Sequence, residues 1–342
     1  MSLLDRALLA ALRRAPSRVR HGLAGRPGPG PAGEVRRQME RDFGLFAPPI
    51  ALHASSPPVL AAAWAMLRET LLHGSVPRPV KETLATEISA ANSCPYCVEV
   101  HGTVLSAVTG GQPGAGPVAE WARASVRRDT ARSAALPGTA AQAPEFLGVA
   151  VTFHYLNRMV NVFLEASPLP PSARAGLREG ALRALGRSLA GPATAPCRPG
   201  EATALLPPAA LPGDLAWAAP NPVLADAFAR VAAAMEAAGE RSVPEPVRAV
   251  VLERLREWDG APPGLGAELF ARLPAEHEAA GRLALLTAFA PYRIDDGLVA
   301  RFRATRGTTA ALAELTAWAA FAAARTAGSW SAPEEMPGGA RR

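Results

Sequence analysis

The sequence predicts an all-α protein, and three of its features support that fold class. Ala and Leu dominate the 342 residues, and apolar side chains recur at steps of three and four along most of the chain. No stretch shows the alternation of apolar and polar residues that is typical of a half-buried strand. The 30 glycines and 34 prolines gather in short stretches without a period, which excludes a collagen-like chain and favours many separate helices.

Five segments show the helical spacing most clearly. In the first of them, Leu60, Trp64 and Leu67 follow one another at steps of four and three. The long fourth segment carries His154, which we expect to be a satisfied core histidine rather than a ligand. The segments are Pro58–His73, Pro79–Ala91, a helix that begins near Cys94, Glu145–Glu165 and Ala310–Thr326.

Composition divides the chain into five parts. Stretches rich in Gly and Pro, such as Gly25–Gly33, mark the borders because they interrupt helical spacing. The expected parts are a basic leader helix with its linker (1–33), a first domain that carries a CxxC motif (34–190), a Pro/Ala-rich linker (191–220), a second domain (221–330) and a tail (331–342).

Charge and hydropathy exclude several classes of protein. The net charge is +6, but Lys81 is the only lysine, and an Arg-, Ala- and Pro-rich chain is typical of GC-rich codon usage. The high isoelectric point is therefore no evidence for a nucleic-acid partner. No apolar run reaches the length of a membrane span, and no targeting signal is convincing, so we expect a cytoplasmic protein. Three cysteines do not make a disulfide scaffold.

A proline-marked pattern occurs twice in the chain. Pro58–Leu60 (PVL) returns as Pro222–Leu224. Ser75–Val80 (SVPRPV) returns as Ser242–Val247 (SVPEPV). The offsets of 164 and 167 residues differ by only three, so the sequence predicts that one helix pair occurs twice. Chance matching in a chain rich in Ala and Pro is the alternative.

Two thiols and an imidazole share one face of the helix that is expected near Cys94. Asn92 and Pro95 fit a helix cap and a first helical position. Cys94, Cys97 and His101 then lie within about 60° of one another around the helix axis. The helix N-terminus and a nearby histidine both favour a thiolate, and a second thiol can close a disulfide onto an oxidised first one. The pattern indicates redox chemistry.

Other uses of the motif are less consistent with its spacing. A structural zinc needs four ligands, and Cys197 lies about 100 residues from the local three. Haem attachment needs a histidine where Val98 stands. CPYC is also the glutaredoxin tetrapeptide, but there it follows a strand, whereas a helix precedes it here. We expect no metal and no cofactor, and inert buried thiols remain the alternative.

The stretch resembles the AhpD-like alkylhydroperoxidases of the carboxymuconolactone decarboxylase superfamily. The family pattern is Glu, eleven residues, Cys, two residues, Cys, three residues, His. Glu82, Cys94, Cys97 and His101 match this spacing in full. The clear resemblance covers about Pro58–Val108.

The resemblance implies an all-helical fold and a thiol-based reduction of hydroperoxides without metal or flavin. It implies that Cys97 attacks the peroxide, that Cys94 resolves the product, and that His101 and Glu82 relay protons. Proximity to the helix N-terminus alone would instead favour Cys94 as the more acidic thiol, so the order of the two stays open. Tyr96 stands where the best-known members carry a second histidine, which implies a weaker relay.

The second copy of the repeat has lost this chemistry. An offset of 167 residues places Ala249, Ala261, Gly264 and Glu268 at the four motif positions. We therefore expect a degenerate AhpD-like half that packs against the first and replaces the subunit contacts of single-domain relatives. A homo-oligomer stays open.

The sequence thus predicts a thiol peroxidase of hydroperoxides that a dithiol or a protein reductant regenerates. Two alternatives remain. One is a decarboxylase of the carboxymuconolactone type that does not use the thiols. The other is a non-catalytic interaction module, which the degenerate half and the basic leader would suit.

Overall fold

The computed structural model describes residues 19–23, 28, 30–111, 116–191, 198–264 and 267–332. Within these residues the chain is helical, with no β-strand and one isolated bridge between Val19 and Leu164. The prediction of an all-α fold is confirmed. The α-helices are α2 (Pro31–Phe43), α3 (Pro48–Ala51), α4 (Pro57–Leu71), α5 (Arg78–Ala91), α6 (Pro95–Thr109), α7 (Pro117–Ala124), α8 (Arg128–Ser133), α9 (Ala143–Phe163), α10 (Ala175–Ala190), α11 (Pro222–Ser242), α12 (Glu245–Glu257), α13 (Ala267–Phe270), α14 (Glu278–Phe289), α15 (Asp296–Arg306) and α16 (Thr309–Trp330). The short 3-10 helices are η1 (Arg20–Gly22), η2 (Thr203–Leu205), η3 (Gly213–Ala218), η4 (Ala275–His277) and η5 (Pro291–Arg293).

Proline marks the beginning of most long helices. It stands in the first turn of α4, α5, α6, α9, α11 and α12, where the missing N–H has no intrahelical acceptor to lose. The five segments expected from apolar spacing are α4, α5, α6, α9 and α16, so those predictions are confirmed. The expected leader helix lies outside the described residues.

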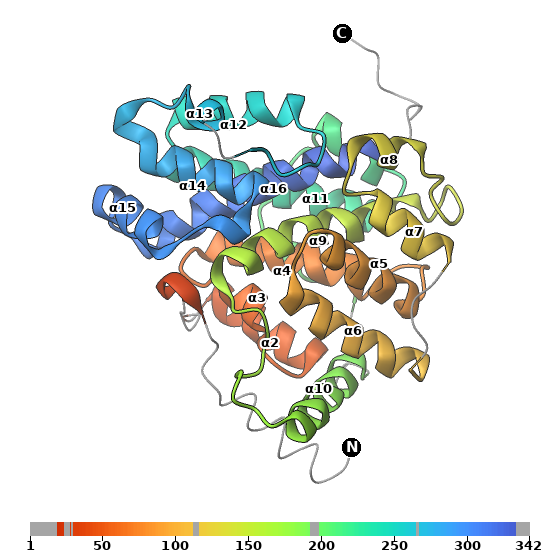
Figure 1. The fold of residues 1–342 in the computed structure, drawn as a ribbon. Coiled ribbons are helices and arrows are strands. Elements are labelled where there is room, and N and C mark those ends of the chain that lie inside the picture. Colours follow the sequence, from red (N-terminus) through yellow and green to blue (C-terminus); the bar gives the residue numbers. More distant parts are fainter. Residues whose placement is uncertain are drawn as a thin grey trace.

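Helix α9 is the centre of the fold. It is buried along nearly its whole length and packs against α4, α5, α14 and α16 (Figure 1). A helix that is apolar all round must be enclosed by other elements, and α4 and α16 follow the same rule. None of the described helices is long and apolar enough to cross a membrane.

The first half of the chain (residues up to 191) and the second half (residues from 198) share one core. A single cluster of buried side chains draws members from both halves, and α11 packs on α4 while α16 packs on α9. The segment expected as a linker also contributes, because Leu215 and Trp217 in η3 are buried. The domain borders and the tandem repeat remain predictions.

A buried ion cluster fixes the described end of that linker to the first half. Arg68 in α4 donates from Nε to Asp42 at 2.8 Å and from Nη2 to Glu201 at 3.0 Å. Arg41 binds the other oxygen of Glu201 at 2.7 Å. Because a buried charge must be paired, each of these side chains depends on the others. The cluster orders the chain where it passes from one half to the other.

The turn between α4 and α5 is held by a carboxylate from α9. Glu145 accepts hydrogen bonds from the N–H groups of Ser75 and Val76 at 2.7 and 3.0 Å, and it pairs with Lys81 at 2.9 Å. Gly74, with φ of +109°, passes so close that an added Cβ would collide with this carboxylate. The contact sets the position of α5, which carries Glu82.

Candidate active site

The turn between α5 and α6 places both thiols. Ser93 adopts the left-handed conformation (φ +54°), and the N–H of Cys94 donates to Ser89 at 2.9 Å. Cys94, rather than Asn92, is the N-cap of α6, and Pro95 is its first helical residue. The tight turn therefore brings Cys94 to the beginning of the helix that carries Cys97, as the sequence predicts to within one residue.

The two thiols lie side by side in a buried position. Cys94 is fully buried, and Cys97 is 3% exposed. Both are free, and Cys94 lies close enough to Cys97 to affect its pKa. Burial and Cys94 together raise the pKa of the Cys97 thiol, while hydrogen bonds with Asn157 and Ser89 oppose that rise. Burial thus outweighs the effect of Asn157 and Ser89, and the resting Cys97 is protonated at neutral pH.

A histidine and a carboxylate face each other across α5 and α6. The Nδ1 of His101 lies 2.8 Å from Oε2 of Glu82, and Arg78 donates to the other Glu82 oxygen at 2.6 Å. Although the burial of Glu82 opposes its ionisation, Arg78 and His101 hold its pKa below the usual value. An ionised carboxylate only accepts, so His101 donates from Nδ1 and keeps Nε2 as its basic nitrogen.

Aromatic side chains fix the orientation of this pair. The ring of Phe153 in α9 meets the His101 ring edge to face, with 4.7 Å between centroids. Tyr96, between the two cysteines, is buried, and its burial raises the pKa of the phenol above the usual value. Tyr96 is therefore a neutral hydroxyl and cannot replace the second histidine of other members as a base.

Helix α9 adds a chain of amides that the sequence did not reveal. Asn157 donates to Ser89 at 2.9 Å, and Asn92 donates to Asn157 at 3.0 Å. Asn92 also lies 3.1 Å from Nδ1 of His154. Asn157 stands in a segment that the sequence singles out, but its contact with Cys97 spans 60 positions and carries no local signal.

The structure brings all four predicted site residues to one place. Cys94 and Cys97 are in contact, and Glu82 and His101 form a pair one helical turn further along α6. Cys197 lies outside the described residues. Within the described part of the chain, no group of three or more His, Cys, Asp or Glu side chains is arranged to hold a metal ion. His101 follows Cys97 by four residues, which is about one turn of α6.

A curated protein from Mycobacterium tuberculosis is similar to nearly the whole chain. It is named alkyl hydroperoxide reductase, and it is 39% identical over 319 residues, which cover 88% of this chain and 91% of that protein. The chain belongs to the AhpD-like alkylhydroperoxidase family. No family model matches the chain, and no solved structure matches it.

Membership of the AhpD-like alkylhydroperoxidases confirms the family that the motif suggested. The long alignment also reaches into the second half, since 88% of 342 residues exceeds the first half alone. The roles of the four motif residues remain predictions.

Proposed function

We propose that this AhpD-like alkylhydroperoxidase reduces organic hydroperoxides through the Cys94–Cys97 pair. One observation carries the proposal: two buried free thiols stand at the beginning of the helix that carries His101, and a buried carboxylate lies 2.8 Å from that histidine. A nucleophile, a base and a group that orients the base are the parts that activated thiol chemistry requires. The name of the mycobacterial relative supports the same reaction class.

The first step oxidises Cys97. His101 takes the thiol proton on Nε2, and Glu82 stabilises the resulting imidazolium. The thiolate attacks the outer oxygen of the hydroperoxide, so that an S–O bond forms as the O–O bond breaks. Cys97 becomes a sulfenic acid, and the alkoxide takes the proton from His101 and leaves as an alcohol.

The second step closes the disulfide and ends the catalytic half-cycle. The Cys94 sulfur attacks the sulfenic sulfur of Cys97, and water leaves with the Cys94 proton. Because a disulfide cannot attack a peroxide, an external dithiol must reduce it and is itself oxidised to a disulfide. The close approach of the two thiols makes this step a small movement of side chains.

Rapid-quench mass spectrometry tests the assignment. The reduced protein receives one equivalent of cumene hydroperoxide, and the cysteines are mapped within seconds. We expect a Cys94–Cys97 disulfide in the natural protein, a trapped sulfenic acid on Cys97 in Cys94→Ser, and no turnover in Cys97→Ser.

Cys197→Ser is the matched control, because it removes the third cysteine, which lies 100 positions after Cys97 in the sequence. It should leave turnover unchanged. Full activity of Cys97→Ser would overturn the proposal. Oxidation of Cys94 first, with a sulfenic acid in Cys97→Ser, would reverse the order of the two thiols.

A further inference from the structure

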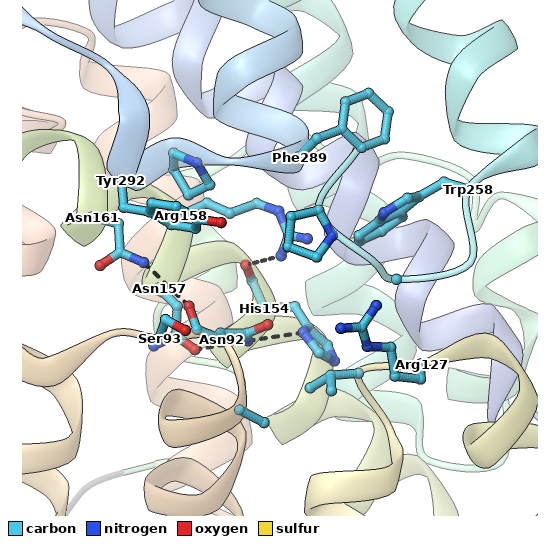
Figure 2. A pocket seen from close by; sticks show the side chains of 15 residues that line it. Asn92, Ser93, Arg127, His154, Asn157, Arg158, Asn161, Trp258, Phe289 and Tyr292 are labelled. Carbon is cyan, nitrogen blue, oxygen red and sulfur yellow. Dashed lines mark hydrogen bonds between the residues drawn. The ribbon is translucent and has the colours of Figure 1, made fainter. Parts of the chain in front are cut away.

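A cavity of about 140 Å³ lies where the two halves of the chain meet (Figure 2). Its walls come from the turn after α5, from α9, and from loops of the second half. The cavity adjoins the thiols, because Ser93 in its wall directly precedes Cys94. Asn157, which hydrogen-bonds with Cys97, is also part of the wall. A molecule bound in the cavity would therefore contact residues that border the thiols, although neither sulfur is itself part of the wall.

His154 lines this cavity and keeps one ring nitrogen without a partner among the described residues. Its Nδ1 accepts a hydrogen bond from Asn92, whose orientation is set by its second bond to Asn157. Burial lowers the pKa of His154 to about 3, so the ring is neutral and its proton is on Nε2. That Nε2 is buried and has no partner among the described residues. A buried donor without an acceptor is unfavourable, and a bound acceptor would remove that cost.

Arg158 adds a buried positive charge to the same wall. Its Nε and Nη1 donate to the carbonyl oxygens of Ala288 and His154 at 2.8 and 2.7 Å. The guanidinium lies over the Trp258 ring, 5.3 Å from its centroid. Within the described residues no carboxylate pairs with it. Burial lowers the pKa of Arg158 to about 10, so the group stays charged at neutral pH.

The rest of the lining favours an organic anion. Arg127 stands exposed at the rim, and in Figure 2 the His154 ring lies between Asn92 and Arg127. No Asp or Glu is among the described residues that line the cavity. The opposite wall is formed by Trp258, Phe289 and other apolar or ring-bearing side chains. Two cations and an orphan donor suit a carboxylate, and the apolar wall suits the carbon chain attached to it.

We propose that this cavity binds the carboxylate of the substrate, and that the enzyme acts on hydroperoxides of organic acids in preference to uncharged ones. The carboxylate accepts hydrogen bonds from His154 Nε2 and from the Arg158 guanidinium. The hydroperoxide end extends past Asn157 towards Cys97. This assignment rests on the proposed function for the reaction, but the anion site itself is testable without it.

Binding is measured by isothermal titration calorimetry with two unreactive probes of equal length, hexanoate and hexanamide. We expect hexanoate to bind at least tenfold more tightly than hexanamide and than inorganic phosphate. Equal affinity for the two six-carbon probes would overturn the anion site. Tighter binding of phosphate would overturn the assignment to an organic acid.

Two variants locate the binding. Arg158→Gln should weaken hexanoate at least tenfold without changing hexanamide, and its melting curve shows whether the core has survived. Arg127→Gln changes an exposed side chain and should not affect folding, so it provides the test if Arg158→Gln does not fold. It should weaken the binding of hexanoate severalfold. Arg132→Gln, an exposed arginine of α8 outside the cavity, is the control of equal charge. An equal loss in Arg127→Gln and Arg132→Gln would overturn the proposal.

Turnover separates this inference from the proposed function. We expect kcat/KM for a carboxylate-bearing hydroperoxide to exceed that for tert-butyl hydroperoxide at least tenfold, and Arg127→Gln to reduce the difference. Hexanoate binding without any turnover would support the anion site and remove the proposed function. Turnover of both hydroperoxides at equal kcat/KM, with no hexanoate binding, would leave the function and overturn the site.

Discussion

Two regions of the molecule begin alike and end differently. In the cysteine region (residues 75–109) and in the counterpart region (residues 242–270), an SVP sequence leads into a helix that begins at a proline-marked turn, α5 or α12. A carboxylate from a long buried helix binds the serine of each turn. Glu145 of α9 accepts from Ser75 Oγ at 2.8 Å, and Glu314 of α16 accepts from Ser242 Oγ at 2.5 Å.

The correspondence continues to the turn at the end of each helix. Ser93 and Gly260 are 167 positions apart, and both have positive φ, +54° and +95°. The prolines after them, Pro95 and Pro262, keep the same offset. These agreements support the tandem repeat that the sequence predicts. The backbones of the two regions therefore agree through this turn and differ after it, although Glu82 already has no acidic counterpart at Ala249.

The residues after each of these prolines account for the difference. In the cysteine region Tyr96 and its successors continue into the 15-residue α6. In the counterpart region a second proline, Pro263, is followed by Gly264, and the next helix is the four-residue α13. Gly and Pro are the poorest helix formers. The same backbone turn can therefore present a reactive helix or end in a loop that closes a cavity wall.

Among these predictions, we expect the largest effect on the reaction rate from replacing Glu82, the carboxylate that orients His101. The counterpart region provides a control substitution. Glu82→Gln removes the charge that stabilises protonated His101, so kcat/KM for hydroperoxide should fall by about 10²–10⁴, the usual contribution of acid–base catalysis. Ala249→Gln places the same side chain at the exposed counterpart position and should leave the rate unchanged. The measurement is steady-state peroxide consumption with a dithiol. An unchanged rate in Glu82→Gln would exclude Glu82 from the proton relay.

Glu145 and Glu314, which bind the serines of the two turns, should contribute differently to the free energy of unfolding. Glu145→Gln leaves the ammonium group of Lys81, whose side chain is only 2% exposed, without its charged partner. The free energy of unfolding should therefore fall by about 3 kcal/mol. Glu314→Gln leaves Arg241, which is half exposed and finds water, so its cost should be about 1 kcal/mol. Urea unfolding of both variants measures the difference. Equal losses would show that pairing with Lys81 contributes little.

Burial of the thiols sets the pH dependence of the cysteine region. Because burial raises the pKa of Cys97 and only the thiolate reacts, the single-turnover rate with hydrogen peroxide should still increase above pH of about 8.5, the ordinary thiol value. Ser89→Ala removes a hydrogen bond that lowers this pKa and should move the profile to higher pH. Ser106→Ala, on the exposed side of α6, should not. An identical pH profile in Ser89→Ala would contradict a contribution of Ser89 to the pKa of Cys97.

The sequence predicted what local spacing determines and missed what packing determines. Cys94, Cys97 and His101 lie within one short helix, so their common face followed from helical geometry alone. Asn157 reaches Cys97 from another helix, and no periodicity reports such a contact. The expected satisfied histidine, His154, is buried as predicted, but one of its nitrogens has no partner in the described structure. His154 lies where the two halves of the chain meet, and the surroundings of its nitrogens depend on how the halves pack, which the sequence does not reveal.

The smallest effect concerns the turn that the two regions share. Ser93 holds a left-handed conformation that costs a residue with a Cβ about 1–2 kcal/mol, whereas the counterpart turn uses glycine. Ser93→Gly removes that strain but adds freedom to the unfolded chain, so it should stabilise the protein by only about 0.5–1 kcal/mol. Ser106→Gly, in the regular part of α6, should instead destabilise by about 0.5–1 kcal/mol. Both are read from urea unfolding midpoints. A loss of stability in Ser93→Gly would mean that the serine side chain stabilises its turn by more than the backbone strain costs. The turns at Ser93 and Gly260 would then share a backbone conformation but not the interactions that stabilise it.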